Sequence, residues 1–557
     1  MTRRREGARR KPAPAPKPGV AAIPAGAPFS PPGWIVIAAL VALAAVVGRH
    51  TLGGFFALDD LILFQQAAGI RPWPFTVWRW LSGWAWFHAV VPLWGHAPFP
   101  YHAASLLLHV ANVMLLHRLA RRWGASPLAA WLGAGLFAAS RLHFPALFAA
   151  TSIGELFALT FTLVALLLAG PGPRAWLALG AFALALSAKE SVLLVPFAAL
   201  LVAPAGTTVR DRARALAPFV AGGALLGALL LASGVGSGRL GGEAYAVSLG
   251  GNLAESVARL FGWTIDLRDP IPDLHATTTG AAHWLLPLLA VALTLLAVRF
   301  GRDALLRAGT AWWWLAVMPV LPLPGRTYLH YLYTPLAGVA LVVAALCDRA
   351  LAARAGATPG RGRQRWAVAL LVLVVYAAWN DVLLSVRADL RMTSTDWPLD
   401  PVLRKSEIAR RGIEDTGAAL AGRRANVAIL IPASISRDVN LGSGAFSANT
   451  PVKRYALEDV LDSGRSLEAL VPEADSVVFV HDYEPGRAGW LLLLSLSDSH
   501  LVPLGVLPAA HGSFVEAMLR SQFPAAALDY ADKALADRAD DAAMRALRER
   551  AAAAVPR

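Results

Sequence analysis

The feature that most constrains this sequence is a series of long apolar runs separated by short polar connections. A helix of roughly 20 apolar residues crosses the hydrocarbon core of a bilayer, where a lipid-exposed segment must satisfy its own backbone hydrogen bonds. The content of 56% hydrophobic and 16% charged residues and the mean hydropathy of +0.51 agree with a membrane protein. We therefore predict an all-α polytopic membrane bundle of about eleven transmembrane helices, centred near Ala42, Val110, Leu132, Phe161, Leu179, Pro196, Leu225, Leu289, Trp314, Val339 and Leu373.

Two parts of this pattern have a second interpretation. The short runs on either side of Lys189 can also form one broken helix. The basic stretch 1–32, followed by the apolar run Trp34 to Val47, resembles a signal peptide, but no clear small-residue cleavage site follows it. We therefore predict a disordered basic cytoplasmic tail over 1–32 and an uncleaved first span.

Arginines concentrate in every second connection, and this predicts the orientation of the bundle. Basic residues resist translocation, so loops that carry them stay in the cytoplasm. The basic connections are the N-terminal tail, Arg118 to Arg122, Arg210 to Arg214, Arg299 to Arg307 and Arg349 to Arg365. The other loops then face the outside of a bacterial inner membrane, together with everything after Val386.

The net charge of +14 would suggest nucleic-acid binding in a soluble protein. Its concentration in alternate loops assigns it to membrane topology instead, so we predict no nucleic-acid partner. Cys347 is the single cysteine, and it has no second cysteine with which to form an intramolecular disulfide.

The composition changes after the last apolar run and predicts three parts: the tail 1–32, a transmembrane domain 33–386 and a soluble periplasmic domain 387–557. In the last part, apolar runs shorten to strand length at Asn426 to Pro432 and at Ser476 to Val480. Amphipathic helical patterns flank them, which predicts a small α/β domain. The alanine and leucine spacing of Phe523 to Leu547 resembles a tetratricopeptide helix pair. One unit cannot stack, so we favour a helical hairpin packed on its own domain.

Ionisable and polar side chains gather at the predicted outer ends of the spans. Such groups are costly near hydrocarbon and are therefore functional candidates. Carboxylates can accept a proton from an acceptor hydroxyl, and cations can neutralise phosphate oxygens, so this mixture suits chemistry on a lipid-linked phosphate. The candidates are Asp59, Asp60, Arg79, Arg141, His143, Glu155, Lys189, Glu190, Arg326, His330 and Tyr331.

Structural roles are an alternative for each candidate. Asp60 can cap a helix that starts at Leu61, and Lys189 with Glu190 can mark a solvated turn. The candidate arginines can extend to lipid headgroups, and the histidines can be interfacial polar residues.

Four segments, "FALDDLILF", "PFPYHAASLLLHVANVMLLHRLARR", "SAKESVLLVPFAALL" and "YLHYLYTPLAG", follow one another between Asp59 and about Pro335. In this order they resemble the polytopic glycosyltransferases of the C-type fold, in particular the protein O-mannosyltransferase-like group whose members often end in tetratricopeptide repeats. The resemblance implies an inverting transferase that moves a sugar from a polyprenyl-phosphate carrier to an acceptor hydroxyl on a glycan, lipid or protein at the outer face.

The resemblance also implies residue roles. The acidic residue tied to catalysis falls on Asp59 or Asp60, and we favour Asp59 as the general base. The cation near the lipid phosphate falls on Lys189 or Arg79, and Glu155 matches the family's acidic position. From the need of a phosphate for fixed positive partners, we predict that Lys189 and Arg326 bind it. The chain departs from the family pattern at Ser140 and Arg141, at Pro145, at Ile153 and at His330, with Arg326 four residues before His330.

Two other classes of protein compete with a transferase. One is a non-catalytic component of surface polysaccharide assembly or export that keeps the fold without the reaction. The other is a transporter, which usually shows internal repeats and charges near the middle of the membrane. We predict no cofactor; carboxylates at Asp59, Asp60 or Glu155 could hold a divalent ion, but we do not favour one.

Overall fold

The computed structural model describes residues 30–73, 79–169, 174–202, 208–232, 247–274, 282–300, 303–323, 326–353, 362–392, 397–430, 456–480, 490–497, 500–508 and 511–555. Nearly all of the basic tail predicted for 1–32, and residues 354–361 of the predicted Arg349 to Arg365 loop, lie outside these ranges.

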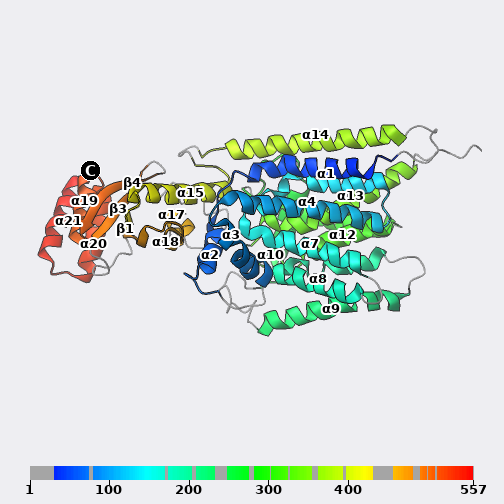
Figure 1. Cartoon of the computed structure of the whole chain (residues 1–557), viewed down its shortest axis with the longest axis horizontal. Coiled ribbons are helices and arrows are strands. Elements are labelled where there is room, and N and C mark those ends of the chain that lie inside the picture. Colours follow the sequence, from blue (N-terminus) through cyan, green and yellow to red (C-terminus); the bar gives the residue numbers. More distant parts are fainter. Residues whose placement is uncertain are drawn as a thin grey trace, which may run out of the picture.

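Helices that run side by side form the larger part of the molecule (Figure 1). Among the described residues, five helical segments are long and apolar enough to cross a membrane: Gly33–Thr51, Pro98–Arg122, Ala150–Leu168, Leu329–Ala352 and Gly362–Asp389. The helices of this bundle are α1 (Gly33–Gly48), α4 (Pro98–Arg122), α5 (Pro127–Ala138), α7 (Ile153–Leu168), α8 (Arg174–Ala188), α9 (Val209–Ala232), α11 (Ala282–Phe300), α12 (Ala304–Val317), α13 (Tyr333–Ala353) and α14 (Gly362–Asp389). The chain is therefore a helical protein of the membrane-embedded type.

Each predicted span centre falls in a helix. Ala42, Val110, Phe161, Val339 and Leu373 lie in these five segments, and the other centres lie in the remaining helices or, for Pro196, in the 3₁₀ helix η6. The two runs around Lys189 do not form one regular helix, because α8 ends at Ala188 and the chain continues as 3₁₀ turns, η5 (Glu190–Val192) and η6 (Val195–Val202). The count of about eleven spans stays a prediction.

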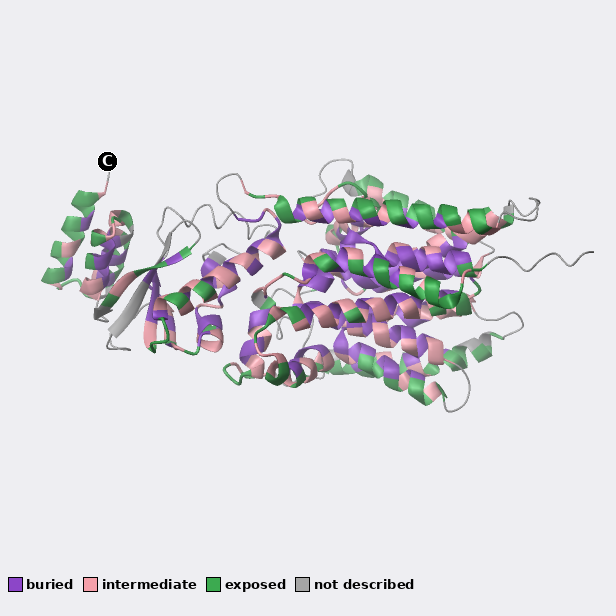
Figure 2. Ribbon diagram, turned by 45° about the horizontal axis from the view of Figure 1, so that its top comes forward, coloured by how far each residue is buried: buried purple, intermediate pink, exposed green. Residues whose placement is uncertain are grey.

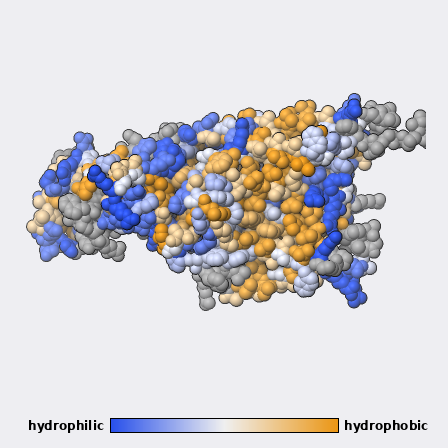
Figure 3. All heavy atoms as spheres, viewed as in Figure 1, coloured by the Kyte–Doolittle hydropathy of each residue, from blue (hydrophilic) through white to orange (hydrophobic). Residues whose placement is uncertain are grey.

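The outward faces of the bundle are apolar. On α14, Val368, Leu371, Val375 and Trp379 are all exposed, and their spacing places them on one face of the helix. On the face drawn in Figure 3, hydrophobic residues cover much of the bundle, and in Figure 2 buried residues run through its interior. An apolar exterior is what a helix that contacts lipid requires.

Two glycines allow α12 and α13 to pack closely. A Cβ atom on Gly309 would lie 2.7 Å from the carbonyl oxygen of Gly338, and one on Gly338 would lie 2.6 Å from the carbonyl oxygen of Gly309. Real Cβ atoms do not approach backbone atoms this closely, so the two backbones touch where small residues permit it.

We expect Gly309→Ala to destabilise the protein by about 1–3 kcal/mol, because α12 and α13 must separate to admit the methyl group. The matched control is Gly180→Ala in α8, where an added Cβ meets no atom within 4 Å. That control should be neutral or stabilising, since Ala is a better helix former than Gly. Thermal unfolding of both variants in detergent tests the prediction, and equal behaviour of the two would contradict it.

Short helices lie at one end of the bundle, next to the C-terminal part of the chain (Figure 1). They are α2 (Leu58–Ala67), the π-helical turn η2 (Trp80–Ala85) and α3 (Trp86–Trp94). The turns η3 (Arg141–His143), α6 (Phe144–Phe148) and η4 (Ala150–Ser152) link α5 to α7, helix α10 (Gly251–Ile265) precedes the loop 266–274, and η8 (Leu329–Leu332) precedes α13.

The C-terminal part contains a four-stranded sheet of order β2-β1-β3-β4. Strand β1 (Ala425–Leu430) pairs in parallel with β2 (Ala474–Phe479) and β3 (Trp490–Ser497), and β3 pairs antiparallel with β4 (His500–Pro508). Alternate residues of β1 enter different cores, Val427 and Ile429 on one face and Ala428 and Leu430 on the other. The helices are α15 (Pro401–Leu420), α17 (Ala456–Val460), α18 (Arg465–Leu470), α19 (His511–Arg520), α20 (Pro524–Asp537) and α21 (Ala542–Ala554).

The first face of this sheet shares a hydrophobic core with the end of the bundle. Phe56, Leu61 and Phe64 belong to the same buried cluster as Ile408 and Leu461. Two polar contacts reinforce this packing: the side-chain amide of Gln65 donates to Ser466 (3.0 Å), and Arg71 pairs with Asp462 (3.1 Å). The C-terminal domain is thus built onto the segment that contains α2.

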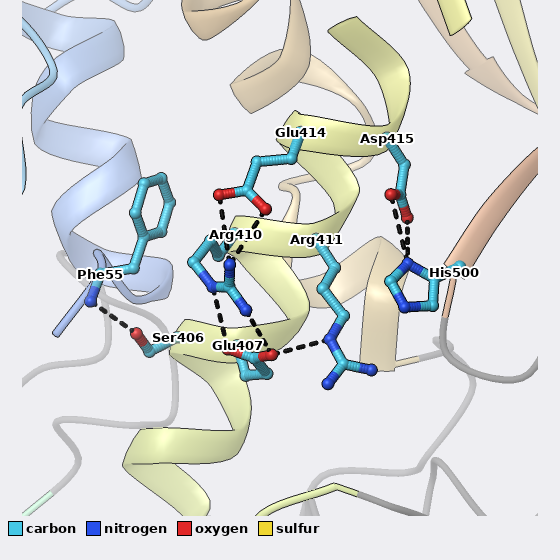
Figure 4. A network of polar contacts seen from close by, with 8 residues as sticks. All are labelled: Phe55, Ser406, Glu407, Arg410, Arg411, Glu414, Asp415 and His500. Carbon is cyan, nitrogen blue, oxygen red and sulfur yellow. Dashed lines mark hydrogen bonds and ion pairs between the residues drawn. The ribbon is translucent and has the colours of Figure 1, made fainter. Parts of the chain in front are cut away.

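Helix α15 connects the bundle to the sheet (Figure 4). At its bundle side, the backbone N–H of Phe55 donates to Ser406 Oγ (3.1 Å). At its sheet side, Asp415 accepts hydrogen bonds from His500 (3.1 Å) and from the backbone N–H of Leu501 (2.8 Å). Between these ends, intrahelical ion pairs join Glu407 to Arg410 and Arg411, and Arg410 to Glu414.

Candidate functional site

A cavity of about 140 Å³ lies where the bundle, the loop 266–274 and α15 meet. Its position is at the end of the bundle that carries the short helices. Polar residues make up much of its wall, which is formed by Ala57, Asp59, Asp60, Pro145, Ala149, Thr151, Ser152, Asp273, Thr327, Tyr328, Leu329, His330, Pro401, Val402 and Lys405.

The two adjacent aspartates occupy different environments. Both lie in the first turn of α2, where the helix dipole favours negative charge. Asp59 is exposed on the cavity wall, whereas Asp60 is buried. Asp60 accepts hydrogen bonds from the backbone N–H groups of Ala57 (3.0 Å) and Thr151 (2.7 Å). The helix begins at Leu58 rather than Leu61, so Asp60 caps it from its third residue and also ties α2 to the turn before α7.

Burial raises the pKa of Asp60 to about 6, although the two backbone hydrogen bonds oppose the shift. At pH values between the ordinary aspartate pKa of about 4 and this raised pKa, Asp60 is protonated in the folded state and ionised in the unfolded state. The free energy of unfolding should therefore fall by about 2–3 kcal/mol as the pH rises from about 4 to about 6.

The check is the difference between the pH profile of the parent and that of Asp60→Asn, which cancels the contributions of other groups. We expect the variant to lack this fall in stability. If the stability of the parent and that of Asp60→Asn change in parallel from about pH 4 to about pH 7, the prediction is wrong.

Aromatic residues also line the cavity. The rings of Tyr328 and His330 stack at 5.5 Å with an interplanar angle of 15°. The ring of His330 also contacts Tyr331, with centroids 4.5 Å apart. The ammonium of Lys189 lies 5.1 Å from the centroid of the buried Tyr331 ring. Lys189 therefore lies near this aromatic group, although it is not one of the residues that line the cavity.

The sequence-predicted cations Lys189 and Arg79 are engaged in ion pairs. Lys189 contacts Glu155 at 2.8 Å, and Glu155 also accepts a hydrogen bond from Ser191 (3.2 Å). Arg79 pairs with Glu190 at 3.0 Å. In the described part of the chain these residues form a cluster next to Tyr331, so the structure brings them near the cavity but not onto its wall. Arg326 directly precedes the wall residue Thr327.

Arg141 and His143 lie in the interior. The guanidinium of Arg141 donates to the carbonyl oxygens of Asp266 (3.1 Å) and Asp269 (2.8 Å), and this holds the loop 266–274 in place. His143 donates from Nε2 to the carbonyl oxygen of Phe137 (2.8 Å) and packs against Tyr333. These contacts fit structural roles better than substrate contacts.

Sequence reasoning missed two charged residues of the wall, Asp273 and Lys405. Asp273 had a signal, because the loop 266–274 contains several aspartates and precedes an apolar run. Lys405 had none, because it belongs to the segment assigned to a separate domain. Burial raises the pKa of the Asp273 carboxyl, and the guanidinium of Arg387 opposes that shift.

A buried group of three charges fixes this part of the wall. Arg387, at the end of α14, contacts both Asp273 (3.4 Å) and Asp400. Asp400 also caps α15 by accepting from the backbone N–H groups of Val402 (2.8 Å) and Leu403 (2.7 Å). The guanidinium lies 4.7 Å from the ring centroid of Phe144. One arginine thereby connects the bundle, the loop 266–274 and α15.

Comparisons of the chain with protein-family models, with curated proteins and with solved structures each return no match. Among the described residues, no group of three or more His, Cys, Asp or Glu side chains is arranged to hold a metal ion. The chemistry that the site can perform is therefore inferred from its geometry. An exposed carboxylate, hydroxyl groups, an aromatic pair and an ammonium surround a small space at the end of a helical bundle.

Proposed function

We propose that the chain is a membrane glycosyltransferase that moves a sugar from a polyprenyl-phosphate donor to an acceptor hydroxyl. The observation that carries the proposal is the exposed Asp59 carboxylate on the wall of a small cavity, lined partly by polar side chains, next to apolar helices. Such a position lets a lipid chain stay in the bilayer while its headgroup reaches polar side chains. The order of the four segments that resemble C-type glycosyltransferases supports the same function.

The cavity wall suits a sugar. Carboxylate and hydroxyl oxygens of Asp59, Thr151 and Thr327 can exchange hydrogen bonds with sugar hydroxyls. The stacked rings of Tyr328 and His330 offer an apolar surface for the C–H face of a pyranose.

In the proposed reaction, the acceptor hydroxyl oxygen attacks the anomeric carbon as Asp59 removes its proton. A new C–O glycosidic bond forms, and the bond between the anomeric carbon and the phosphate oxygen breaks. The phosphate leaves with the bonding electron pair, so it needs a cation rather than an acid. Attack from the face opposite the phosphate inverts the anomeric centre.

The test is transfer of radiolabelled sugar by the purified protein from defined polyprenyl-phosphate sugars to simple glycosides, lipids and Ser/Thr peptides. A deletion strain examined for missing sugars on surface glycans and secreted proteins identifies the acceptor class. Absence of transfer from every donor, together with an unchanged set of glycans, would reject the function in favour of a non-catalytic role in polysaccharide assembly.

We propose a bacterial inner-membrane location with a cytoplasmic N-terminus and a periplasmic C-terminal domain. The alternating arginine loops support it. The start of α1 and the C-terminal domain also lie at opposite ends of the bundle (Figure 1).

A reporter that is active only in the periplasm should therefore work when fused after Arg557 and fail when fused after Arg363. The reason is that the second fusion point lies at the start of α14, directly after an arginine-rich connection. The opposite pattern of activity would overturn the orientation.

A further inference from the structure

A groove of about 620 Å³ lies between α10, the start of α11 and the loop 266–274. It shares no lining residue with the cavity of about 140 Å³ that includes Asp59. We propose that this groove binds a phospholipid with a phosphoethanolamine headgroup, the phosphate at Arg268 and Arg259 and the ammonium at Asp266. The inference is independent of the proposed function, because the ligand is a lipid of the bilayer that undergoes no reaction.

The groove is placed to receive acyl chains from the bilayer. Two of its lining residues, Ile265 and Leu267, are 47% and 55% exposed. Beside the groove, α11 exposes Leu288, an apolar side chain suited to contact with lipid. The indole of Trp379, on the exposed apolar face of α14, donates to the carbonyl oxygen of Leu267. Tryptophan is enriched at the membrane–water interface, so this contact indicates that the loop 266–274 lies at the level of the headgroups.

Two arginines line the groove and supply the positive charge that a phosphate requires. Arg268 is exposed, and its backbone N–H donates to Asp266 Oδ1 (2.7 Å). Arg259 has 15% of its side chain exposed and pairs through Nη2 with Glu255 on the same helix. Among the described residues, the buried Nε–H of Arg259 has no hydrogen-bond acceptor. A buried N–H without an acceptor is costly, and a phosphate oxygen in the groove would provide one.

The carboxylate of Asp266 places a negative charge beside Arg268. Asp266 Oδ1 accepts hydrogen bonds from the backbone N–H groups of Arg268 and Asp269 (3.1 Å), and it lies 3.8 Å from the guanidinium of Arg141. These contacts all involve Oδ1, and the side chain is 32% exposed. A carboxylate has about four acceptor sites on its two oxygens, so Asp266 can also accept hydrogen bonds from a ligand ammonium.

The balance of charge in the groove favours a zwitterionic headgroup. Its lining residues include two guanidinium groups and two carboxylates, so a headgroup that carries only negative charge would meet repulsion as well as attraction. In phosphoethanolamine an ethylene bridge joins the phosphate to the ammonium, and Arg268 and Asp266 belong to one turn of the loop. The ammonium can donate hydrogen bonds to a carboxylate, whereas the trimethylammonium of phosphocholine has no N–H group. The groove should therefore prefer phosphoethanolamine to both phosphocholine and phosphoglycerol.

The experiment measures, by native mass spectrometry, how tightly the purified full chain binds phosphatidylethanolamine, phosphatidylcholine and phosphatidylglycerol with identical acyl chains. We expect the parent to bind phosphatidylethanolamine roughly 3- to 10-fold more tightly than the other two lipids. Arg268→Gln should weaken the binding of all three lipids roughly 3- to 10-fold, because it removes a charged partner of the phosphate. Asp266→Asn keeps an oxygen for the backbone N–H groups, and it should weaken only phosphatidylethanolamine, to about the affinity of phosphatidylcholine.

The matched control is Arg520→Gln, which changes an exposed arginine of α19 that pairs with Glu516. This variant should keep all three affinities within about twofold of the parent. Equal binding of the three lipids by the parent, or a preference for phosphatidylglycerol, would overturn the proposal. A preference for phosphatidylethanolamine that survives both Arg268→Gln and Asp266→Asn would also overturn it, because the lipid would then bind elsewhere.

The pattern across the lipids separates ligand contacts from effects on folding. If Asp266→Asn weakens all three lipids equally, the carboxylate supports the loop and does not bind the ammonium, and the assignment to phosphoethanolamine is wrong. Sugar transfer is not measured in these assays. A chain that prefers phosphatidylethanolamine but transfers no sugar would therefore retain this inference while rejecting the transferase proposal, and a transferase without lipid preference would do the reverse.

Discussion

Asp59→Asn is expected to reduce the rate of sugar transfer by roughly 10² to 10⁴, the usual contribution of general acid–base catalysis. The substitution keeps the shape of the side chain but removes its ability to accept a proton. Because Asp59 is exposed on the cavity wall, the variant should fold and unfold like the parent. The measurement is single-turnover transfer from a defined lipid donor by purified protein.

Asp60→Asn serves as the comparison, since it changes the neighbouring carboxyl in the same way. Asp60 is buried and bonded to the backbone of Ala57 and Thr151, so its loss should act through the position of α2 and through stability. Its effect on transfer should follow its effect on thermal unfolding. A near-parental rate in Asp59→Asn would remove Asp59 from the mechanism, whichever result Asp60→Asn gives.

The apolar helices of the bundle could be predicted because their signal is local. A helix in lipid must be apolar along its own length, so hydropathy alone located segments such as α1 and α14. Strands carry a weaker signal. The run Trp490–Ser497 forms β3 and pairs with β4, but its apolar stretch is short and its partners are distant or follow a turn. Only β1 and β2 overlap the runs expected to be strands.

The site could be predicted only in part. The sequence shows that a charged side chain lies near the membrane, but it does not show which partner in the fold stabilises that charge. Asp59 and Lys189 give the same signal in sequence, a charge beside an apolar run. In the fold, Asp59 lies on the cavity wall, whereas Lys189 forms an ion pair with Glu155 and is not one of the wall residues. Arg141 also has partners within the protein, because its guanidinium donates hydrogen bonds to backbone carbonyls of the loop 266–274.

Local sequence patterns could not predict the contacts between segments that are distant in the chain. Asp273, Arg387 and Asp400 lie in a loop, at the end of a span and at a helix cap, and each has an ordinary local explanation. Their meeting depends on how α15 packs against the bundle. The border predicted at Val386 separates Arg387 from the bundle, yet α14 continues to Asp389 and this arginine holds both parts together.

Arg387→Met is expected to lower the free energy of unfolding by about 3–5 kcal/mol, because it leaves two buried carboxylates without their cation. Both Arg387 and Asp400 are almost fully buried, with side chains 1% and 0% exposed, so water cannot replace the lost partner. The matched control is Lys533→Ala, which breaks an ion pair whose side chains are 58% and 67% exposed. Exposed pairs contribute less than about 1 kcal/mol, so the control should be nearly neutral.

A rescue experiment identifies the cause of the loss. Adding Asp273→Asn and Asp400→Asn to Arg387→Met removes the unpaired charges, and Asn remains a good cap for α15. The triple variant should therefore recover most of the lost stability, measured by denaturant titration in detergent. Mild acid should also lessen the defect of the single variant, because burial already raises the pKa of Asp273 and favours its neutral form. If Arg387→Met costs no more than Lys533→Ala, or if the triple variant is as unstable as the single one, the three charges do not hold α15 on the bundle.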